Sequence, residues 1–266
     1  MAKNKEIIFQ FEKALLKTFL FLLVSCILTP YTFGQKELTA KEVVIKAYEK
    51  MKGESTGFSS MKMDIIRPTW NRTISFKSWS KSTELALSLV TAPKKEEGQT
   101  FLKRGKEMWS WNPIINRMIK LPPSMMSQGW MGSDFTNDDL LNEASMVDDY
   151  SHRLSGYEKV GDKDCYLLEL TPKENAAVVW GKLKMWISKG DFLQMKTEFF
   201  DEEGKLMKTQ SAFDIKKMGG RIIPTRVELN PADKPGNKTV ITLESVEFNK
   251  AIPDQFFSQQ NMKIVK

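Results

Sequence analysis

Polar and apolar positions alternate along most of the chain that follows Gly57. This period of two is typical of strands that bury one face and leave the other face in water. The alternating segments are 61–65, 72–76, 85–89, 166–170, 183–187, 193–199 and 223–229. Turn sequences rich in Gly and Asp stand between several of them, and the chain lacks the regularly spaced helices of a parallel sheet. The pattern predicts a mainly β domain of roughly ten strands in an antiparallel meander that curls.

A short helix is predicted before the first strand. Thr39 and Glu42 have the capping-box spacing, in which a hydroxyl and a carboxylate each bind a free amide of the first helical turn. The apolar residues that follow on one helical stripe are Val43, Val44, Ala47, Tyr48 and Met51. Gly53 and Gly57 end this pattern, so we expect a short amphipathic helix.

One insertion, residues 122–149, interrupts the meander. Pro122 and Pro123 end the strand before it, because proline cannot donate a hydrogen bond to a sheet. Thr136 and Asp139 form a second capping box, which predicts a short helix carrying Leu140 and Leu141. An insertion this long and this apolar is typical of a lid over a functional site.

The first 34 residues predict an exported protein. Four lysines lie within the first 17 residues, and residues 18–28 form an apolar run. Small residues ending at Gly34 then offer a cleavage site for a signal peptidase. The apolar run is shorter than the roughly 20 residues of a transmembrane helix. We expect a signal peptide at 1–34 and one domain at 35–266, folded outside the cytoplasm. The residues LVSC also read as a lipobox, so a membrane lipoprotein acylated at Cys26 is the alternative.

Charge and cysteine content narrow the possible functions. Removing the leader takes away four Lys and two Glu, so the net charge falls from +7 to +5 over the remaining 232 residues. This mild excess is spread along the chain, whereas nucleic-acid binding uses a concentrated basic stripe, so we expect no nucleic acid. Cys165 is then the only cysteine, and its apolar neighbours predict a small buried thiol. We expect a monomer without an internal disulfide.

The chain lacks a recognisable catalytic motif and has a single histidine, His152. General acid–base catalysis usually recruits histidine, so we expect no enzyme, no cofactor and no metal. An acidic group close to His152 leaves one alternative, a metal-assisted lipid hydrolase in which the carboxylates hold Ca²⁺ or Mg²⁺. This group consists of Asp134, Asp138, Asp139, Asp148 and Asp149. Helix capping by Asp138 and Asp139, with solvated loop charge for the other residues, explains the same group without a metal.

Large apolar residues concentrate in and just before the insertion. Methionine is flexible and polarizable, so it suits a surface that accepts ligands of variable shape, such as acyl chains. The residues that we expect to bind lipid are Trp109, Trp111, Met125, Met126, Trp130, Met131, Phe135, Leu140 and Leu141. Ordinary core beneath a loop is the other interpretation of the same residues.

Four stretches carry a family resemblance: IIRPTWNRTISFKSWS, WSWNPIINRMIKLPPSMM, QGWMGSDFTNDDL and IPDQFFSQQNMK. They resemble the outer-membrane lipoprotein-sorting proteins of the LolA-like superfamily, over essentially the whole of residues 35–266. The resemblance implies a half-open antiparallel β-barrel with an N-terminal helix and a helical lid. In LolA and LolB, the apolar cavity of this barrel holds the acyl chains of a lipoprotein that crosses the periplasm.

The resemblance also implies partners and a lid contact. The expected partners are acylated lipoproteins or phospholipid, an inner-membrane ABC-type releasing complex and an outer-membrane acceptor. LolA closes its lid with an arginine inside the barrel. Arg72 is the strand-borne candidate here, and a surface position is its alternative. We therefore expect a periplasmic carrier that binds acyl chains of lipoproteins or lipids and moves them towards the outer membrane. RseB shares the fold and senses envelope stress, so a sensor of misplaced envelope components is a further alternative.

Overall fold

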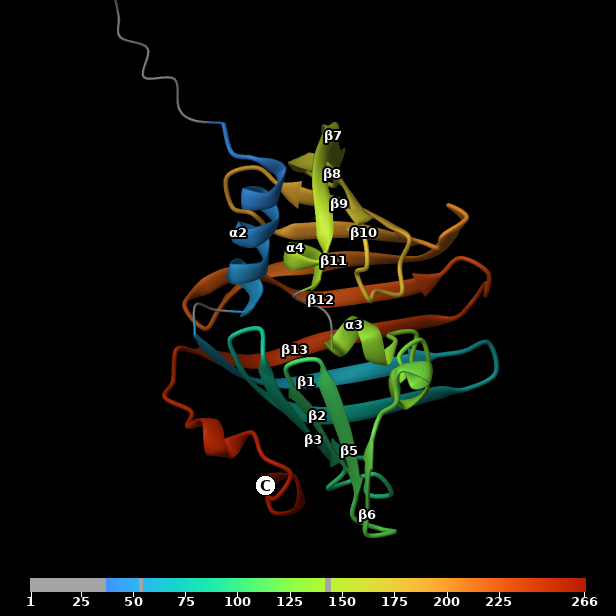
Figure 1. Cartoon of the computed structure of the whole chain (residues 1–266), viewed down its shortest axis with the longest axis vertical. Coiled ribbons are helices and arrows are strands. Elements are labelled where there is room, and N and C mark those ends of the chain that lie inside the picture. Colours follow the sequence, from blue (N-terminus) through green and yellow to red (C-terminus); the bar gives the residue numbers. More distant parts are fainter. Residues whose placement is uncertain (1–36, 53–54, 142–144) are drawn as a thin grey trace, which may run out of the picture. The chain divides into compact units, whose positions relative to one another are not determined.

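Thirteen antiparallel strands form a single sheet in the computed structural model, which describes residues 37–52, 55–141 and 145–266 (Figure 1). The strands are β1 (Thr56–Ile66), β2 (Asn71–Lys81), β3 (Leu85–Ala92), β4 (Thr100–Arg104), β5 (Glu107–Asn112), β6 (Arg117–Lys120), β7 (Tyr150–Val160), β8 (Lys163–Pro172), β9 (Lys182–Ser188), β10 (Gln194–Phe200), β11 (Leu206–Met218), β12 (Arg221–Pro231) and β13 (Lys238–Phe248). The predicted signal peptide and Cys26 lie outside the described residues. All of these strands belong to one compact unit, Leu38–Lys266.

The pairing order makes the sheet a meander folded back at its centre. In that order the strands are β6-β5-β4-β3-β2-β1-β13-β12-β11-β10-β9-β8-β7. The first and last strands, β1 and β13, therefore pair in the middle, with Met63 opposite Ile241. Strands β6 and β7 are the two edges, and they do not pair with each other, so the sheet stays open. The predicted half-open antiparallel barrel is confirmed.

The prediction of roughly ten strands was too low. Strand β5 shows why the shorter strands escaped detection: Trp109 and Trp111 project to one face, and Met108 and Ser110 project to the other. Both faces of this strand carry apolar side chains, so alternation between polar and apolar residues is absent. A strand that is covered on both faces loses the period-two signal.

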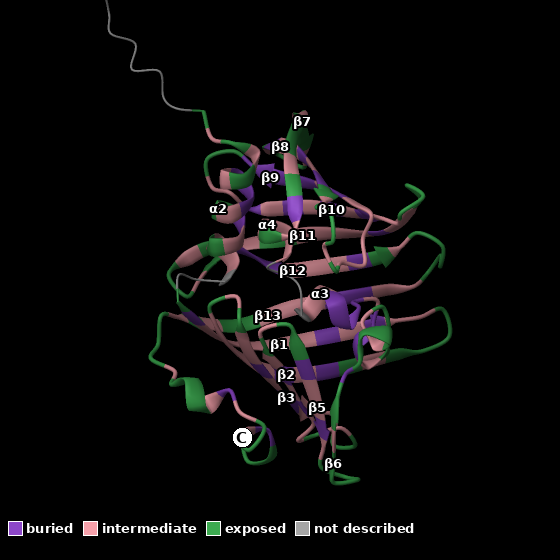
Figure 2. Ribbon diagram, viewed as in Figure 1, coloured by how far each residue is buried: buried purple, intermediate pink, exposed green. Residues whose placement is uncertain are grey.

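Helix α2 (Ala40–Lys52) begins at the predicted capping box. The Thr39 amide donates to Glu42 Oε2 at 2.7 Å, and the Glu42 amide donates to Thr39 Oγ1 at 3.2 Å. Val43, Val44 and Ala47 are buried against the C-terminal strands, in a cluster that includes Leu168, Leu183 and Phe199. We call the sheet face beneath this helix the inner face. Figure 2 shows buried segments both along these strands and on the side of α2 that packs against them.

Residues 122–149, here called the crossing segment, connect the two edge strands. They contain η1 (Pro123–Met125), η2 (Trp130–Gly132), α3 (Asn137–Leu141) and α4 (Ser145–Asp148). Strands β6 and β7 are the opposite edges of an open sheet, and their connection crosses the inner face, where Trp130 packs against Phe76. The second predicted capping box starts α3: the Thr136 amide donates to Asp139 Oδ2 at 2.6 Å, and the Asp139 amide donates to Thr136 Oγ1 at 3.1 Å.

The C-terminal segment after β13 covers the opposite, outer face of the N-terminal strands. It contains η3 (Asp254–Phe256) and η4 (Asn261–Lys263). Phe257 and Met262 are fully buried against Leu87, Leu102 and Trp111. Together with the inner cores, this second layer buries both faces of β3 and β4. None of the described helices has the length and apolarity needed to cross a bilayer.

Candidate ligand cavity beneath the crossing segment

A cavity of about 330 Å³ lies between the inner face, helix α2 and the crossing segment. This volume falls at the lower end of the range for small-molecule pockets. Its apolar lining includes Ala47, Met61, Phe76, Trp130, Phe135, Leu140, Met185, Phe199, Val227 and Ile241. Helix α2, the crossing segment and strands from both halves of the sheet therefore all contribute to one largely apolar space.

Trp130 closes one side of the cavity. It packs edge-on against Phe76 at 5.4 Å and against Phe101 at 5.3 Å between ring centroids. Only 3% of this residue is exposed, and it belongs to a cluster with Met63 and Ile74 on the inner face. The crossing segment is thus anchored in the core of the N-terminal half by a large aromatic side chain.

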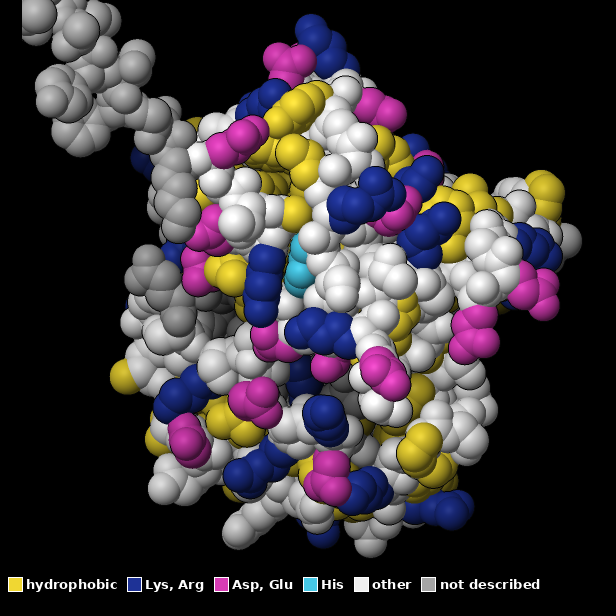
Figure 3. All heavy atoms as spheres, turned by 45° about the horizontal axis from the view of Figure 1, so that its top comes forward, with side chains coloured by type: hydrophobic (Ala, Val, Ile, Leu, Met, Phe, Trp, Pro, Cys, Tyr) yellow, Lys and Arg dark blue, Asp and Glu magenta, His cyan; other side chains and the backbone are white. Residues whose placement is uncertain are grey.

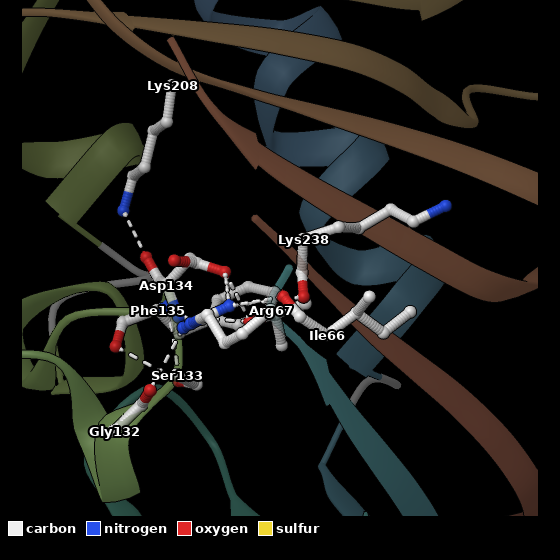
Figure 4. A network of polar contacts seen from close by, with 9 residues as sticks. Ile66, Arg67, Gly132, Ser133, Asp134, Phe135, Lys208 and Lys238 are labelled. Carbon is white, nitrogen blue, oxygen red and sulfur yellow. Dashed lines mark hydrogen bonds and ion pairs between the residues drawn. The ribbon is translucent and has the colours of Figure 1, made fainter. Parts of the chain in front are cut away.

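A buried polar contact also attaches the crossing segment to the sheet (Figure 4). Arg67, directly after β1, donates from Nη1 to Asp134 Oδ2 at 3.0 Å and from Nη2 to the Gly132 carbonyl at 3.0 Å. Thr239, on β13, donates its hydroxyl to the same Asp134 oxygen at 2.6 Å and accepts from the Asp134 amide at 3.0 Å. The Arg67 and Asp134 side chains are 12% and 8% exposed, so water screens this ion pair weakly.

A second buried ion pair joins α3 to the C-terminal half of the sheet. Lys208, on β11, donates to Asp139 Oδ2, and Trp180 Nε1 donates to Asp139 Oδ1 at 3.1 Å. The two charged side chains are only 5% and 9% exposed. Burial lowers the pKa of the Lys208 ammonium, and the Asp139 carboxylate opposes that shift. The ammonium also lies 3.5 Å from the Asp134 carbonyl, which places the two ion pairs next to each other (Figure 4).

Arg72 makes a third polar contact with the crossing segment. Its Nη1 donates to the Met131 carbonyl at 3.2 Å, and its Nη2 is paired with Glu96. Sequence reasoning named Arg72 but missed Arg67 and Lys208. Arg67 directly follows β1 and precedes Pro68, and Lys208 lies in a strand whose neighbouring residues give no sign that its side chain is buried. Their partners, Asp134 and Asp139, lie 67 and 69 residues away in the chain. The local sequence pattern does not predict contacts over such a distance.

Comparisons with known proteins agree with this architecture. A family profile described as an uncharacterized protein matches residues 82–264, which is more than half of the chain. The chain belongs to this family, and its fold is that of the LolA superfamily. A LolA superfamily protein from Nitrosomonas europaea is 26% identical, with a TM-score of 0.73 over 85% of this chain and 100% of that protein. The predicted resemblance is therefore confirmed.

Two further solved structures share the LolA fold of this chain. A DUF1329 family protein from Desulfovibrio piger has a TM-score of 0.77 and 24% identity, over 84% of this chain and 97% of that one. A putative outer membrane lipoprotein-sorting protein domain from Vibrio parahaemolyticus has a TM-score of 0.73 and 19% identity, over 84% and 98%. By sequence, no curated protein matches the chain.

The LolA fold distributes the residues expected to bind lipid over three environments. Trp130, Phe135 and Leu140 line the cavity. Met126 and Met131 pack on the neighbouring core cluster, which contains Trp130. Met125 is placed by its carbonyl, which accepts a hydrogen bond from the Asn137 side chain. Leu141 is the last residue of α3, and its side chain lies outside the described part of the structure. Trp109 and Trp111 do not reach the cavity. They lie on the outer face under the C-terminal segment, because strand alternation turns them away from Met108, which does line the cavity.

Two acidic residues of the crossing segment, Asp134 and Asp139, act as pairing or capping groups. Asp134 pairs with Arg67, Asp139 caps α3 and pairs with Lys208, and Asp138 is buried in the first turn of α3. Asp148 is exposed at the end of α4. Within the described residues, no three His, Cys, Asp or Glu side chains come close enough to hold a metal ion.

His152 and Cys165 are structural residues of the C-terminal strands. His152 Nε2 bonds the Met146 carbonyl at 2.7 Å, and burial lowers the pKa of its imidazole. Cys165 is fully buried beside Trp186 and Leu193, as predicted, and burial raises the pKa of its thiol. A buried thiol with a raised pKa is a poor nucleophile. On the surface shown in Figure 3, basic and acidic side chains are interspersed, without a block of one sign.

Proposed function

We propose that this protein is a non-enzymatic carrier that shelters the acyl chains of a lipid or a lipoprotein in the cavity beneath the crossing segment. The observation that carries this proposal is the apolar cavity itself, closed by Trp130, Phe135 and Leu140 of the crossing segment. Each methylene buried there would contribute about 0.8 kcal/mol. A chain of variable length could then bind tightly without strict geometry, as a shuttle requires.

The place of action follows from the same proposal. We infer that residues 1–34 direct the chain to the periplasm and that a membrane complex loads the cavity there. The superfamily resemblance supports an inner-membrane ABC-type complex as donor and an outer-membrane acceptor as recipient. The similar domain from Vibrio parahaemolyticus, a putative outer membrane lipoprotein-sorting protein, supports the same direction of transfer.

Filling the cavity tests the proposal. Ala212 lies on β11 and lines the cavity, whereas its neighbour Phe213 is exposed. Ala212→Trp should therefore block an acyl chain, and Phe213→Trp is the matched control on the other face of the same strand. We expect Ala212→Trp to weaken binding of a fluorescent fatty acid at least tenfold, which corresponds to about 1.4 kcal/mol.

The control should bind like the unmodified protein. Thermal unfolding of both variants establishes that the comparison is between folded proteins. If Ala212→Trp folds and binds the fatty acid with unchanged affinity, the cavity is not the acyl site and the proposal is wrong.

A further inference from the structure

Strands β12 and β13 pair along only part of their length. Their register joins four residue pairs and ends where Arg226 lies opposite Thr242. Beyond that point, residues 221–224 of β12 pair with β11, and residues 243–248 of β13 pair with β1. These two stretches are both described, and no pairing joins one to the other. We call the place where the two strands separate the split.

The residues on both sides of the split explain why the pairing stops there. Pro224 has no backbone N–H to donate, and proline within a sheet is confined to edges and bulges. On β13, Glu244 is an extra residue, because the register with β1 shifts between Ser60 and Met61. A bulge of this kind bends its strand. Each strand thus carries an irregularity that favours separation from the other.

The cavity reaches the split. Thr225, Leu243 and Val246 contribute to its lining, from both strands. Pro224 lines it as well, although its partner on β11, Ile215, packs against the cluster of the outer face. Cross-strand partners share a face, so alternation assigns the Pro224 side chain to the outer face. The cavity wall therefore includes the edge that β12 presents where β13 has left it.

The turn between β11 and β12 closes the far end of the split. A Cβ atom at Gly219 would lie 2.8 Å from the Val246 carbonyl oxygen, so the turn and β13 approach each other closely. Arg221 adds a second contact: its Cζ lies 4.5 Å from the centroid of the Phe248 ring, and its Nη1 donates to the Glu49 carbonyl at 2.9 Å. One side chain thus joins β12, β13 and helix α2 beside the split.

The crossing segment is held more firmly than this turn. The side chains of its two ion pairs are between 5% and 12% exposed, and Trp130 is buried in the core. Moving the segment away would separate both pairs and expose the indole ring. The Arg221 contact consists of one solvent-exposed hydrogen bond and one ring contact. Exposed contacts contribute far less than buried ion pairs that lose a partner, so the split is the easier place to open.

We propose that an acyl chain enters and leaves the cavity through the split, and that Arg221 is the strap that holds this route closed. The inference rests on the proposed function and adds the route by which the ligand reaches its site. The chain passes sideways between two strands, while its head group, or the polypeptide attached to it, stays outside the sheet. The crossing segment remains in place during this exchange.

Exchange rates test the route, because a strap controls how fast a ligand passes and not how well it fits. Arg221→Met removes the guanidinium and keeps a long side chain. Arg226→Met is the matched control, since Arg226 lies on the same strand and stacks on Phe213 at 4.3 Å, but at a position where β12 and β13 are paired. Stopped-flow mixing with a fluorescent fatty acid, and its displacement by excess oleate, give the association and dissociation rate constants.

We expect Arg221→Met to raise both rate constants by about fivefold, which corresponds to the loss of a contact of about 1 kcal/mol. Because both rates rise together, Kd should stay nearly constant. Arg226→Met should change neither rate.

A second pair of variants acts on the turn itself. Gly219 and Gly220 have φ angles of +56° and +82°, so alanine strains the backbone at either position. The added Cβ meets β13 at Gly219, whereas nothing lies within 4 Å of one at Gly220. Gly219→Ala should therefore push the turn away from β13 and speed exchange, and Gly220→Ala should not. This pair decides the question if Arg221→Met does not fold, which thermal unfolding establishes.

The outcomes separate the route from the carrier function. Unchanged exchange rates in Arg221→Met and in Gly219→Ala would overturn the route. Faster exchange in Asp139→Asn, which loosens the crossing segment, without any change in Arg221→Met would also overturn it. In both cases the fatty acid still binds, so the carrier proposal stands. Failure of the unmodified protein to bind a fatty acid would overturn both proposals.

Discussion

The buried pair between Lys208 and Asp139 should control how firmly the crossing segment is held. Asp139→Asn preserves the shape of the side chain and an oxygen for the Thr136 amide, but it removes the charge opposite the Lys208 ammonium. Removing one partner of a buried ion pair typically costs about 3–5 kcal/mol, because the other charge stays buried alone. In a domain of this size 1 kcal/mol shifts Tm by about 2–4 °C, so Tm should fall by roughly 6–20 °C.

A double-mutant cycle isolates the interaction. Lys208→Met should also destabilise, since it leaves the Asp139 carboxylate without its cation. The double variant Asp139→Asn/Lys208→Met buries no charge at this position, so it should be more stable than Asp139→Asn alone, with a coupling energy of about 2 kcal/mol or more. Urea unfolding followed by tryptophan fluorescence measures the free energy of unfolding of all three variants. Trp180 reports on this position, because its ring centroid lies 4.4 Å from Lys208 Nζ.

An exposed ion pair supplies the control. Lys41 and Asp148 are 3.9 Å apart, with side chains 47% and 71% exposed, so Asp148→Asn should change stability by only about 0–1 kcal/mol. Hydrogen exchange gives a second readout: Asp139→Asn should speed exchange of the Asp138 amide, which bonds the Met126 carbonyl within the crossing segment. If the two single losses simply add in the double variant, within about 0.5 kcal/mol, the pair does not act as a unit and the reasoning fails.

Two other predictions concern Trp130 and His152. Trp130→Ala should lower the free energy of unfolding, measured in urea, by about 3–5 kcal/mol, because the ring is buried against Phe76 and Phe101. Ile114→Ala is the control and should cost little, because Ile114 is 65% exposed. Equal losses of stability in the two variants would contradict this prediction. Because the folded pKa of His152 lies below 6.5, the unfolded chain binds its proton more readily, so stability should fall as pH drops below about 6.5. His152→Gln should remove that part of the pH dependence, and an unchanged profile would refute it.

The sequence alone determined the local structure well. Alternation located strands such as 183–187 and 193–199, because a half-buried strand must place apolar residues at every second position. The two capping boxes fixed the starts of α2 and α3, because side chains three residues apart satisfy amides within the same turn. These signals act over a few residues and need no knowledge of the rest of the chain.

Only the tertiary structure decided which face is which. Trp109 and Trp111 look like ligand-binding residues in the sequence, yet they pack under the C-terminal segment, since alternation separates two faces without telling which one is inner. The cavity is hidden for the same reason. In β2, Phe76 is followed on its own face by Ser78 and Ser80. In the sequence this change from apolar to polar residues suggests that the strand becomes exposed to solvent, whereas in the structure both serines line the cavity.

The contacts of the crossing segment are the least local of all. Arg67 reaches Asp134 and Lys208 reaches Asp139 across more than 60 residues, because the chain runs from one edge of an open sheet to the other between β6 and β7. A charged residue in a strand normally faces water, and the sequence around Lys208 gives no sign that its side chain is buried. Only the position of the crossing segment over the inner face buries these charges with their partners.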